Sequence, residues 1–284
     1  MAEQQERVEG WLDGVHGVEL FWRGWLPGGE HPGVVLVCHG LGEHSGRYGT
    51  VVDALVPDGW AVYGLDHRGH GRSSGRRVHL DRYADWLADL DTFRRHVVTR
   101  HEGLPVFLLG HSMGGQIALA YALDQQDDLS GLILSAPVLA SNAVPKAAVP
   151  VLRGLAKIAP TLRPAGIDVT KVSKDPAVVA AYQADPLVYH GNPTLGLFAE
   201  LFAQFGVLPG RARGLRLPLL LQHGMADELT DPAGSRLLAS TSGSPDQTVH
   251  WYEGLWHEIY HEPERERPLA DLRQWLASHA PVRG

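Results

Sequence analysis

Residues 106–115 read VFLLGHSMGG, and this stretch decides the fold. The apolar run 106–109 predicts a buried strand, and residues 116–123 after the glycines predict a helix. Between them, Ser112 occupies the centre of the pattern G-x-S-x-G. A sharp strand-to-helix turn exposes such a serine as a nucleophile, and small neighbours permit the strained backbone that this requires. The alternative is that Ser112 only caps the helix.

A second match to the same pattern, GRSSG at residues 71–75, lacks this context. No apolar strand comes directly before it, and no helical pattern comes directly after it. We therefore predict that residues 71–75 form a loop without a nucleophile.

The alternation of strand and helix extends to both sides of residues 106–115. Unbroken short apolar runs bounded by turn residues are typical of parallel strands that are buried on both faces. Such runs cover residues 34–38, 60–65, 106–109 and 132–134, and further strands are predicted at 18–25, 217–221 and 248–252. Helical patterns cover residues 81–101, 117–123, the stretch opened by Asp231-Pro232, and 263–278. Strands separated by helices predict an α/β fold with a mostly parallel central sheet flanked by helices.

Residues 141–215 interrupt this alternation. Eight prolines occur in this segment, and it shows no strand pattern. We predict short helices joined by proline turns, inserted as a cap into one α/β core that comprises residues 1–140 and 216–284. The alternative is irregular packing within the same layer of the sheet.

Composition limits the function classes. With 44% hydrophobic and 20% charged residues, the 284-residue chain is globular, and its length allows about two domains or one large one. The net charge of −7 disfavours a nucleic-acid binder. A single cysteine, Cys38, allows neither an internal disulfide nor a cysteine-based zinc cluster. The chain shows neither a secretory signal nor a stretch of 18 apolar residues, so we expect it in the cytoplasm.

A nucleophilic serine needs a base, and the base needs an orienting acid. In the order Ser, Asp or Glu, His, the acid follows a late strand. Asp227 lies in the loop after residues 217–221 and is the predicted acid, with Glu228 as the alternative. Asp231 precedes Pro232 and is better explained as a helix cap.

The histidine should follow the last strand. His257 lies in the loop after that strand and is the predicted base, with His261 as the second choice, whereas His250 lies within the strand. Residues 257–261 (HEIYH) also match the zinc-peptidase motif H-E-x-x-H. That chemistry needs both histidines on one face of a helix, which nearby Pro263 disfavours, so we expect no metal site.

The turn after residues 34–38 reads HGLGEHSGRY at 39–48. In this arrangement, an N–H group of that turn and the N–H group after the nucleophile form an oxyanion hole. We therefore predict Leu41 and Met113 as backbone donors. The alternative is a plain glycine turn, since neither a dinucleotide nor a phosphate-loop pattern is present.

Together, five stretches resemble the monoacylglycerol lipases of the α/β-hydrolase superfamily. They are residues 39–48, 66–73, 110–115, 223–231 and 252–257. The resemblance extends from about Trp22 to Trp275 and is weak within 141–215, where only residues 182–187 are similar to the family.

The resemblance implies an α/β-hydrolase fold with a lid, and it implies Ser112, Asp227 and His257 as the triad. It also places Glu43, Arg47 and Tyr182 at the glycerol end of the pocket, although Glu43 and Arg47 could equally be a structural ion pair. Tyr260 stands where the family has a second histidine.

The predicted function is hydrolysis of carboxylic esters without a metal or organic cofactor, and monoacylglycerols are the predicted substrates. The alternatives are a general carboxylesterase or lysophospholipase and, more remotely, a zinc peptidase or a non-catalytic lipid-binding protein. The apolar segment 147–162 carries only the charges of Arg153 and Lys157, which adds the hypothesis of peripheral contact with lipid surfaces. An ordinary amphipathic lid helix is the alternative.

Overall fold

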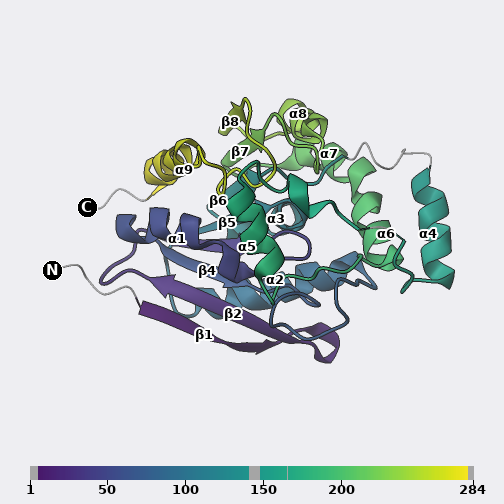
Figure 1. Ribbon diagram of the computed structural model, residues 1–284. Helices are drawn as coiled ribbons and strands as arrows, with labels where there is room; N and C mark the ends of the chain where they lie inside the picture. The colour runs from purple at the N-terminus through teal and green to yellow at the C-terminus, as the bar shows by residue number, and fades with distance from the viewer. Residues whose placement is uncertain (1–5, 141–147, 165, 281–284) are drawn as a thin grey trace.

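The computed structural model describes residues 6–140, 148–164 and 166–280. These residues form an eight-stranded sheet with the strand order β1-β2-β4-β3-β5-β6-β7-β8 (Figure 1). The strands are β1 (Glu6–Asp13), β2 (Glu19–Leu26), β3 (Val34–Cys38), β4 (Ala61–Leu65), β5 (Val106–His111), β6 (Gly131–Ser135), β7 (Leu219–Gly224) and β8 (Gln247–Tyr252).

The six strands β3 to β8 run parallel to one another. Strand β2 pairs with β4 in the antiparallel direction, and β1 pairs with β2 in the antiparallel direction. In the centre, Cys38 at the end of β3 is paired with Gly110 near the end of β5. Because the carboxyl ends of parallel strands share one edge of a sheet, the turns after β3, β5, β7 and β8 meet there. The α/β-hydrolase fold with a mostly parallel sheet is thus confirmed.

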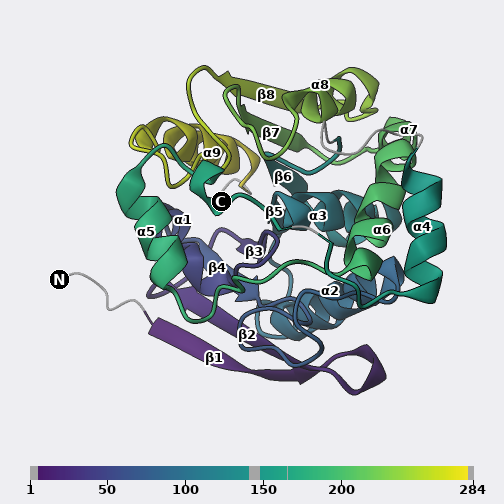
Figure 2. The same ribbon diagram turned by 45° about the vertical axis from the view of Figure 1, so that its right-hand side comes forward.

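Helices cover both faces of the sheet (Figures 1 and 2). The helices are α1 (Gly49–Leu55), α2 (Tyr83–Val98), α3 (Met113–Asp124), α4 (Val149–Ile158), α5 (Pro176–Ala184), α6 (Leu195–Ala203), α7 (Leu208–Arg211), α8 (Pro232–Thr241) and α9 (Glu266–His279). Among the described residues, no helix has both the length and the apolar character needed to cross a bilayer.

Successive side chains of a strand point to opposite faces, and the two cores follow this alternation. Val35 and Val37 of β3 pack in one core with α1 and α9. Leu36 packs in the other core with α2, α3 and α8. Since every residue of β3 is buried, the strand has no polar face, which explains its unbroken apolar sequence.

The predicted strands and helices are confirmed within a few residues at their ends, but two elements were missed. The edge strand β1 alternates between exposed and half-buried residues and carries three acidic side chains, so it lacks a buried strand's apolar run. Helix α1 has only seven residues and begins at Gly49.

The segment between β6 and β7 contains α4, α5, α6 and α7, as the prediction of short helices stated. Proline lies in the first turn of three of them, α4, α5 and α7. Figure 2 shows α4 and α6 side by side at the right of the molecule and α5 at the left. Residues 141–147 lie outside the described residues, and the division into core and cap at 141 and 215 stays a prediction.

Helix α3 approaches β3 closely through Gly114, where an added Cβ would overlap the carbonyl groups of Cys38 and His39. A methyl group at Gly154 in α4 would meet open space. We expect Gly114→Ala to lower the free energy of unfolding by more than about 2 kcal/mol, because overpacking against backbone outweighs the gain in helix propensity.

Gly154→Ala is the matched control and should leave that free energy unchanged or raise it by up to about 1 kcal/mol. Urea denaturation of both variants measures the difference. Equal stability of Gly114→Ala and the parent protein would contradict the close contact.

Candidate active site

Ser112 lies at the turn between β5 and α3 with φ of 54° and ψ of −119°. This left-handed φ is strained for a residue with a side chain, and such strain is typical of functional sites. The turn is held by the backbone: the Ser112 N–H donates to Ser135 O (3.0 Å), and the Ser112 carbonyl accepts from Val138 N–H (3.0 Å). No side chain caps α3, so Ser112 is not the capping serine of the alternative explanation.

Small residues are required around this turn. A Cβ on Gly110 would overlap the carbonyl of Gly114, and a Cβ on Gly40 would lie 3.3 Å from the Cβ of Ser112. Gly40 follows β3, so the turn after β3 lies directly against the serine.

The serine of the second G-x-S-x-G match is used differently. Ser73 is fully buried, and its hydroxyl donates to Asp66 O (2.5 Å) and accepts from Phe21 N–H (2.8 Å). Residues 71–75 therefore form a structural loop, as predicted.

Asp227 and His257 come together from the loops after β7 and β8. The distance between His257 Nδ1 and Asp227 Oδ2 is 2.7 Å. Asp227 Oδ1 also accepts from the N–H groups of Leu229 and Thr230, and Oδ2 accepts from Thr230 Oγ1. His223 Nε2 lies 3.2 Å from Oδ2. No local pattern in the sequence pointed to the contributions of Thr230 and His223.

The charges at this pair oppose the effect of burial. Burial alone would raise the pKa of Asp227, but His257, His223 and their hydrogen bonds hold it well below its usual range. Burial lowers the pKa of His257, yet the charge and hydrogen bond of Asp227 and the charges of Glu258 and Glu43 raise it above its usual value. Asp227 is therefore an ionised acceptor that holds the Nδ1–H tautomer of His257.

The competing acids and bases are engaged elsewhere. Glu228 is exposed and pairs with Lys171 (2.5 Å), and Asp231 caps α8 by accepting from Ala233 N–H (2.9 Å). His261 Nε2 contacts the Arg47 carbonyl (2.8 Å), and His250 lies within β8.

The HEIYH segment does not form the helix that a zinc peptidase needs. Residues 257–261 form turns and bends, and the carboxylate of Glu258 is bound by Arg47. Within the described ranges, no group of three or more His, Cys, Asp or Glu side chains is arranged to hold a metal ion.

Residues 39–42, here named the oxyanion loop, are fixed by side chains on both sides. The ring of His39 contacts Gly40 O through Nδ1 (2.7 Å) and accepts from His67 N–H through Nε2 (2.9 Å). Gly40 N–H donates to Glu43 Oε1 (2.6 Å). Within the part of the chain that the structure describes, the N–H groups of Leu41 and Met113 donate no hydrogen bond and stay available for a ligand.

The three predicted pocket residues, Glu43, Arg47 and Tyr182, also lie together, but they contact one another and a further carboxylate instead of standing free in a pocket. Arg47 Nη1 contacts Glu43 Oε2 (2.7 Å), and its guanidinium lies 4.4 Å from the ring centre of Tyr182. The cluster is buried rather than at the surface, and it includes Glu258, which sequence reasoning considered only as part of the zinc motif. Tyr260 turns away and donates to Gln222 Oε1 (2.5 Å).

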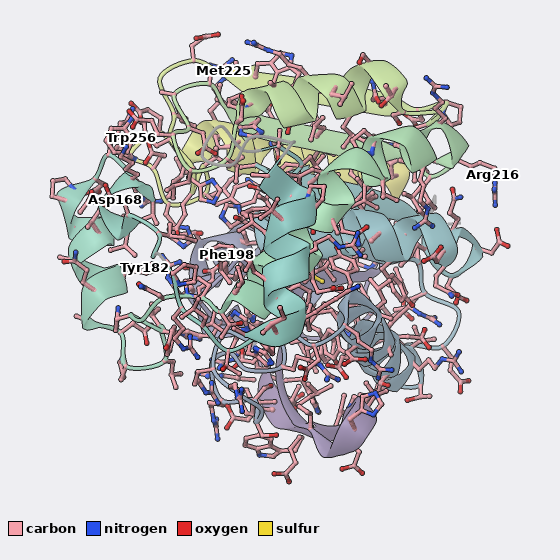
Figure 3. All side chains as sticks on the ribbon, turned by 90° about the vertical axis from the view of Figure 1, so that its right-hand side faces the viewer. Asp168, Tyr182, Phe198, Arg216, Met225 and Trp256 are labelled. Carbon is pink, nitrogen blue, oxygen red and sulfur yellow. The ribbon has the colours of Figure 1, made fainter. Side chains whose placement is uncertain are left out.

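The four side chains of this cluster come from three distant parts of the chain. In Figure 3, Tyr182 lies on the side of α5 that faces the sheet. Glu43 and Arg47 follow β3, and Glu258 follows β8. The inserted segment and both parts of the core thus contribute to one buried cluster.

Comparison with known proteins shows the family of this chain. A family profile described as "Serine aminopeptidase, S33" matches residues 29–264. A monoacylglycerol lipase of Mycolicibacterium smegmatis is 41% identical over 96% of this chain and 98% of its own length. A monoglyceride lipase of Rattus norvegicus is 33% identical over 96% of this chain and 91% of its own length.

Solved structures give the same result. The monoacylglycerol lipase of Paleococcus ferrophilus matches with a TM-score of 0.82 and 32% identity, covering 97% of this chain and 99% of that one. A soluble variant of the Saccharomyces cerevisiae monoglyceride lipase, in complex with a substrate analogue, matches with a TM-score of 0.87 and 26% identity, covering 100% and 98%. The chain belongs to the monoacylglycerol lipase family of the α/β-hydrolases.

Proposed function

We propose that this protein hydrolyses monoacylglycerols to fatty acid and glycerol through a serine triad of Ser112, His257 and Asp227. Family membership makes it an ester hydrolase. The observation that carries the proposal is the strained backbone of Ser112 at the same sheet edge as the 2.7 Å pair of His257 and Asp227. A strained serine at the sheet edge that also carries an oriented histidine supports the assignment of an activated nucleophile.

In the proposed reaction, His257 Nε2 takes the proton of Ser112 as its Oγ attacks the ester carbonyl. The N–H groups of Leu41 and Met113 donate to the resulting oxyanion. The C–O bond to glycerol breaks as His257 returns the proton to the leaving oxygen. Water, activated by His257, then cleaves the acyl-serine ester and releases the fatty acid. Every proton transfer uses groups of this chain, so the scheme requires no metal or organic cofactor.

The triad assignment predicts different results for two neighbouring acidic residues. Asp227→Asn should lower kcat by about 10⁴-fold, because His257 would lose the partner that fixes its tautomer. Glu228→Gln should keep kcat within about twofold, since surface ion pairs contribute little. Turnover of a monoacylglycerol measures both.

The nucleophile is tested separately with a fluorophosphonate probe. Ser112→Ala should abolish labelling, while Ser73→Ala removes the buried serine of the second G-x-S-x-G match and provides the control. Persistent labelling of Ser112→Ala would contradict the nucleophile assignment.

The substrate class rests on the relatives, whose names also include a caffeoylshikimate esterase and a phospholipase. We propose that Glu43, Arg47 and Tyr182 border the glycerol end of the pocket. Since Arg47 is bound by two carboxylates, we expect its side chain to limit the size of the glycerol site without moving when substrate binds.

A panel of substrates tests this proposal. We expect the largest kcat/KM for monoacylglycerols among mono-, di- and triacylglycerols, a lysophospholipid, short p-nitrophenyl esters and an amino-acid p-nitroanilide. A larger value for the lysophospholipid or the short esters would favour the alternative lysophospholipase or carboxylesterase. A larger value for the anilide would favour a peptidase.

Helix α4 supports the proposal of peripheral contact with lipid. Val151, Leu155 and Ile158 recur at helical spacing and are 63%, 51% and 85% exposed. Arg153 and Lys157 on the same helix are exposed too. In Figure 3, α4 stands nearest to the viewer, in front of the rest of the chain. Exposed apolar side chains beside cations favour a surface of anionic lipid.

We expect Leu155→Glu combined with Ile158→Glu to lower co-sedimentation with phosphatidylserine–phosphatidylcholine vesicles by about tenfold, because two apolar side chains would no longer enter the lipid. Turnover of a water-soluble ester should not change. Leu237→Glu, at a 43% exposed residue of α8, is the matched control. Unchanged sedimentation of the double variant would contradict the lipid contact and favour an ordinary lid helix.

A further inference from the structure

Glu258 directly follows His257 and binds Arg47 through both of its carboxylate oxygens. Arg47 Nη1 donates to Oε1 (2.6 Å) and Nη2 donates to Oε2 (2.7 Å). Glu258 is only 4% exposed. This paired geometry is the strongest and most directional form of an arginine–carboxylate contact.

The other end of this contact reaches the oxyanion loop. Arg47 Nη1 also donates to Glu43 Oε2 (2.7 Å). Glu43 Oε1 in turn accepts from Gly40 N–H (2.6 Å) and from the hydroxyl of Tyr48 (2.9 Å). Gly40 precedes Leu41, whose N–H is a proposed oxyanion donor. The contacts between Glu43, Arg47 and Glu258, here named the carboxylate bridge, therefore connect the neighbour of Leu41 with the neighbour of His257.

Backbone contacts hold the bridge in place. The Glu258 N–H donates to Val172 O (2.8 Å) in the inserted segment, and His261 Nε2 contacts Arg47 O (2.8 Å). A cavity of only about 10 Å³ lies among Glu43, Glu258 and their neighbours. This is at most enough space for one water molecule, so the bridge is direct and is little screened by solvent.

We propose that Glu258 is a positioning residue of the reaction, which through Arg47 and Glu43 fixes His257 relative to the oxyanion loop; this rests on the proposed triad. The loops that carry His257 and Leu41 follow different strands, β8 and β3, and these are not neighbours in the sheet. The carboxylate bridge between these loops keeps the distance between the base and the oxyanion donors constant. The rate of acyl transfer depends steeply on that distance.

The charge of Glu258 adds an effect that can be measured. The charged groups near His257 are Asp227, Glu258 and Glu43, with Arg47 between the two glutamates. The neutral neighbours are Thr230 and His111, whose ring centre lies 4.7 Å from that of His257. Burial and His257 lower the pKa of His111 to about 4, so His111 adds no charge near neutral pH. His223 faces Asp227, and His261 faces Glu258.

The sign of the charge effect follows from these neighbours. Burial lowers the pKa of His257, but Asp227, Glu258 and Glu43 raise it above its usual value. Removing the charge of Glu258 should therefore lower the pKa of His257. Because His257 must be neutral to accept a proton, the acidic limb of the kcat/KM profile should move to lower pH.

Two substitutions separate position from charge. Glu258→Gln removes the charge and one of the two contacts with Arg47. Glu258→Asp keeps the charge but is too short to hold both contacts. The matched control is Asp58→Asn, because Asp58 forms an equally paired contact with Arg273 (2.6 and 2.7 Å) that is exposed and joins the 3-10 turn Val56–Asp58 to α9.

The experiment is a pH profile of monoacylglycerol hydrolysis for the parent protein and these variants. Each rate is divided by the concentration of active sites titrated with a fluorophosphonate, so that unfolded protein does not count. For Glu258→Gln we expect kcat about tenfold lower, KM within about twofold, and an acidic limb moved down by about half a pH unit. Glu258→Asp should lower kcat without moving the limb, and Asp58→Asn should match the parent protein.

Parental kcat and parental limb in Glu258→Gln would overturn the inference. If Glu258→Gln yields no titratable sites, Glu258→Asp decides, and a parental kcat in that variant overturns the positioning role. Ser112→Ala and His257→Ala are included in the same series, with their rates divided by total protein concentration because loss of the triad removes the sites that the probe titrates. If either stays active, the proposed triad fails; if both are inactive and Glu258→Gln is normal, only the role of Glu258 fails.

Discussion

The contact between Gly114 and the carbonyl groups of Cys38 and His39 is the constraint on which the site depends. It brings the first turn of α3 against the end of β3, and only a glycine fits there. As a result, the turn after β3 lies directly against Ser112, where an added Cβ on Gly40 would be 3.3 Å from the Cβ of Ser112. The parallel pairing of Cys38 in β3 with Gly110 in β5 determines where the turns after these two strands lie. In our proposal, these buried strands position backbone N–H groups, and no side chain, as the donors to the oxyanion.

In our proposal, the acid and the base reach Ser112 from the loops after β7 and β8, which lie at one edge of the sheet, so their position needs support beyond the pairing of strands. Asp227 receives it from the N–H groups of its own loop and from Thr230 and His223. In our proposal, His257 receives it from Asp227 and, through Glu258, from the carboxylate bridge. The bridge also contacts Tyr182 of the inserted segment, so in our proposal the substrate pocket and the reaction centre share one buried group of charges.

The core strands were predictable because burial on both faces leaves an unbroken apolar run, whereas the half-exposed β1 leaves none. Ser112 was predictable because its neighbours in sequence determine its geometry. Glu258 was considered only within a false zinc motif, since its partner Arg47 lies 211 residues away and no local pattern records that contact. For the same reason, the sequence suggested a surface pair for Glu43 and Arg47, although the second carboxylate, that of Glu258, makes their contact part of a buried network.

A crystal structure with a monoacylglycerol-like phosphonate tests the central claim most directly, because the phosphonate mimics the charge and shape of the transition state. We predict a bond from Ser112 Oγ to phosphorus, with one phosphonate oxygen about 3 Å from the N–H groups of Leu41 and Met113. Arg47 should remain bound to Glu43 and Glu258. A phosphonate attached to another residue, or an oxygen that avoids both N–H groups, would contradict the account.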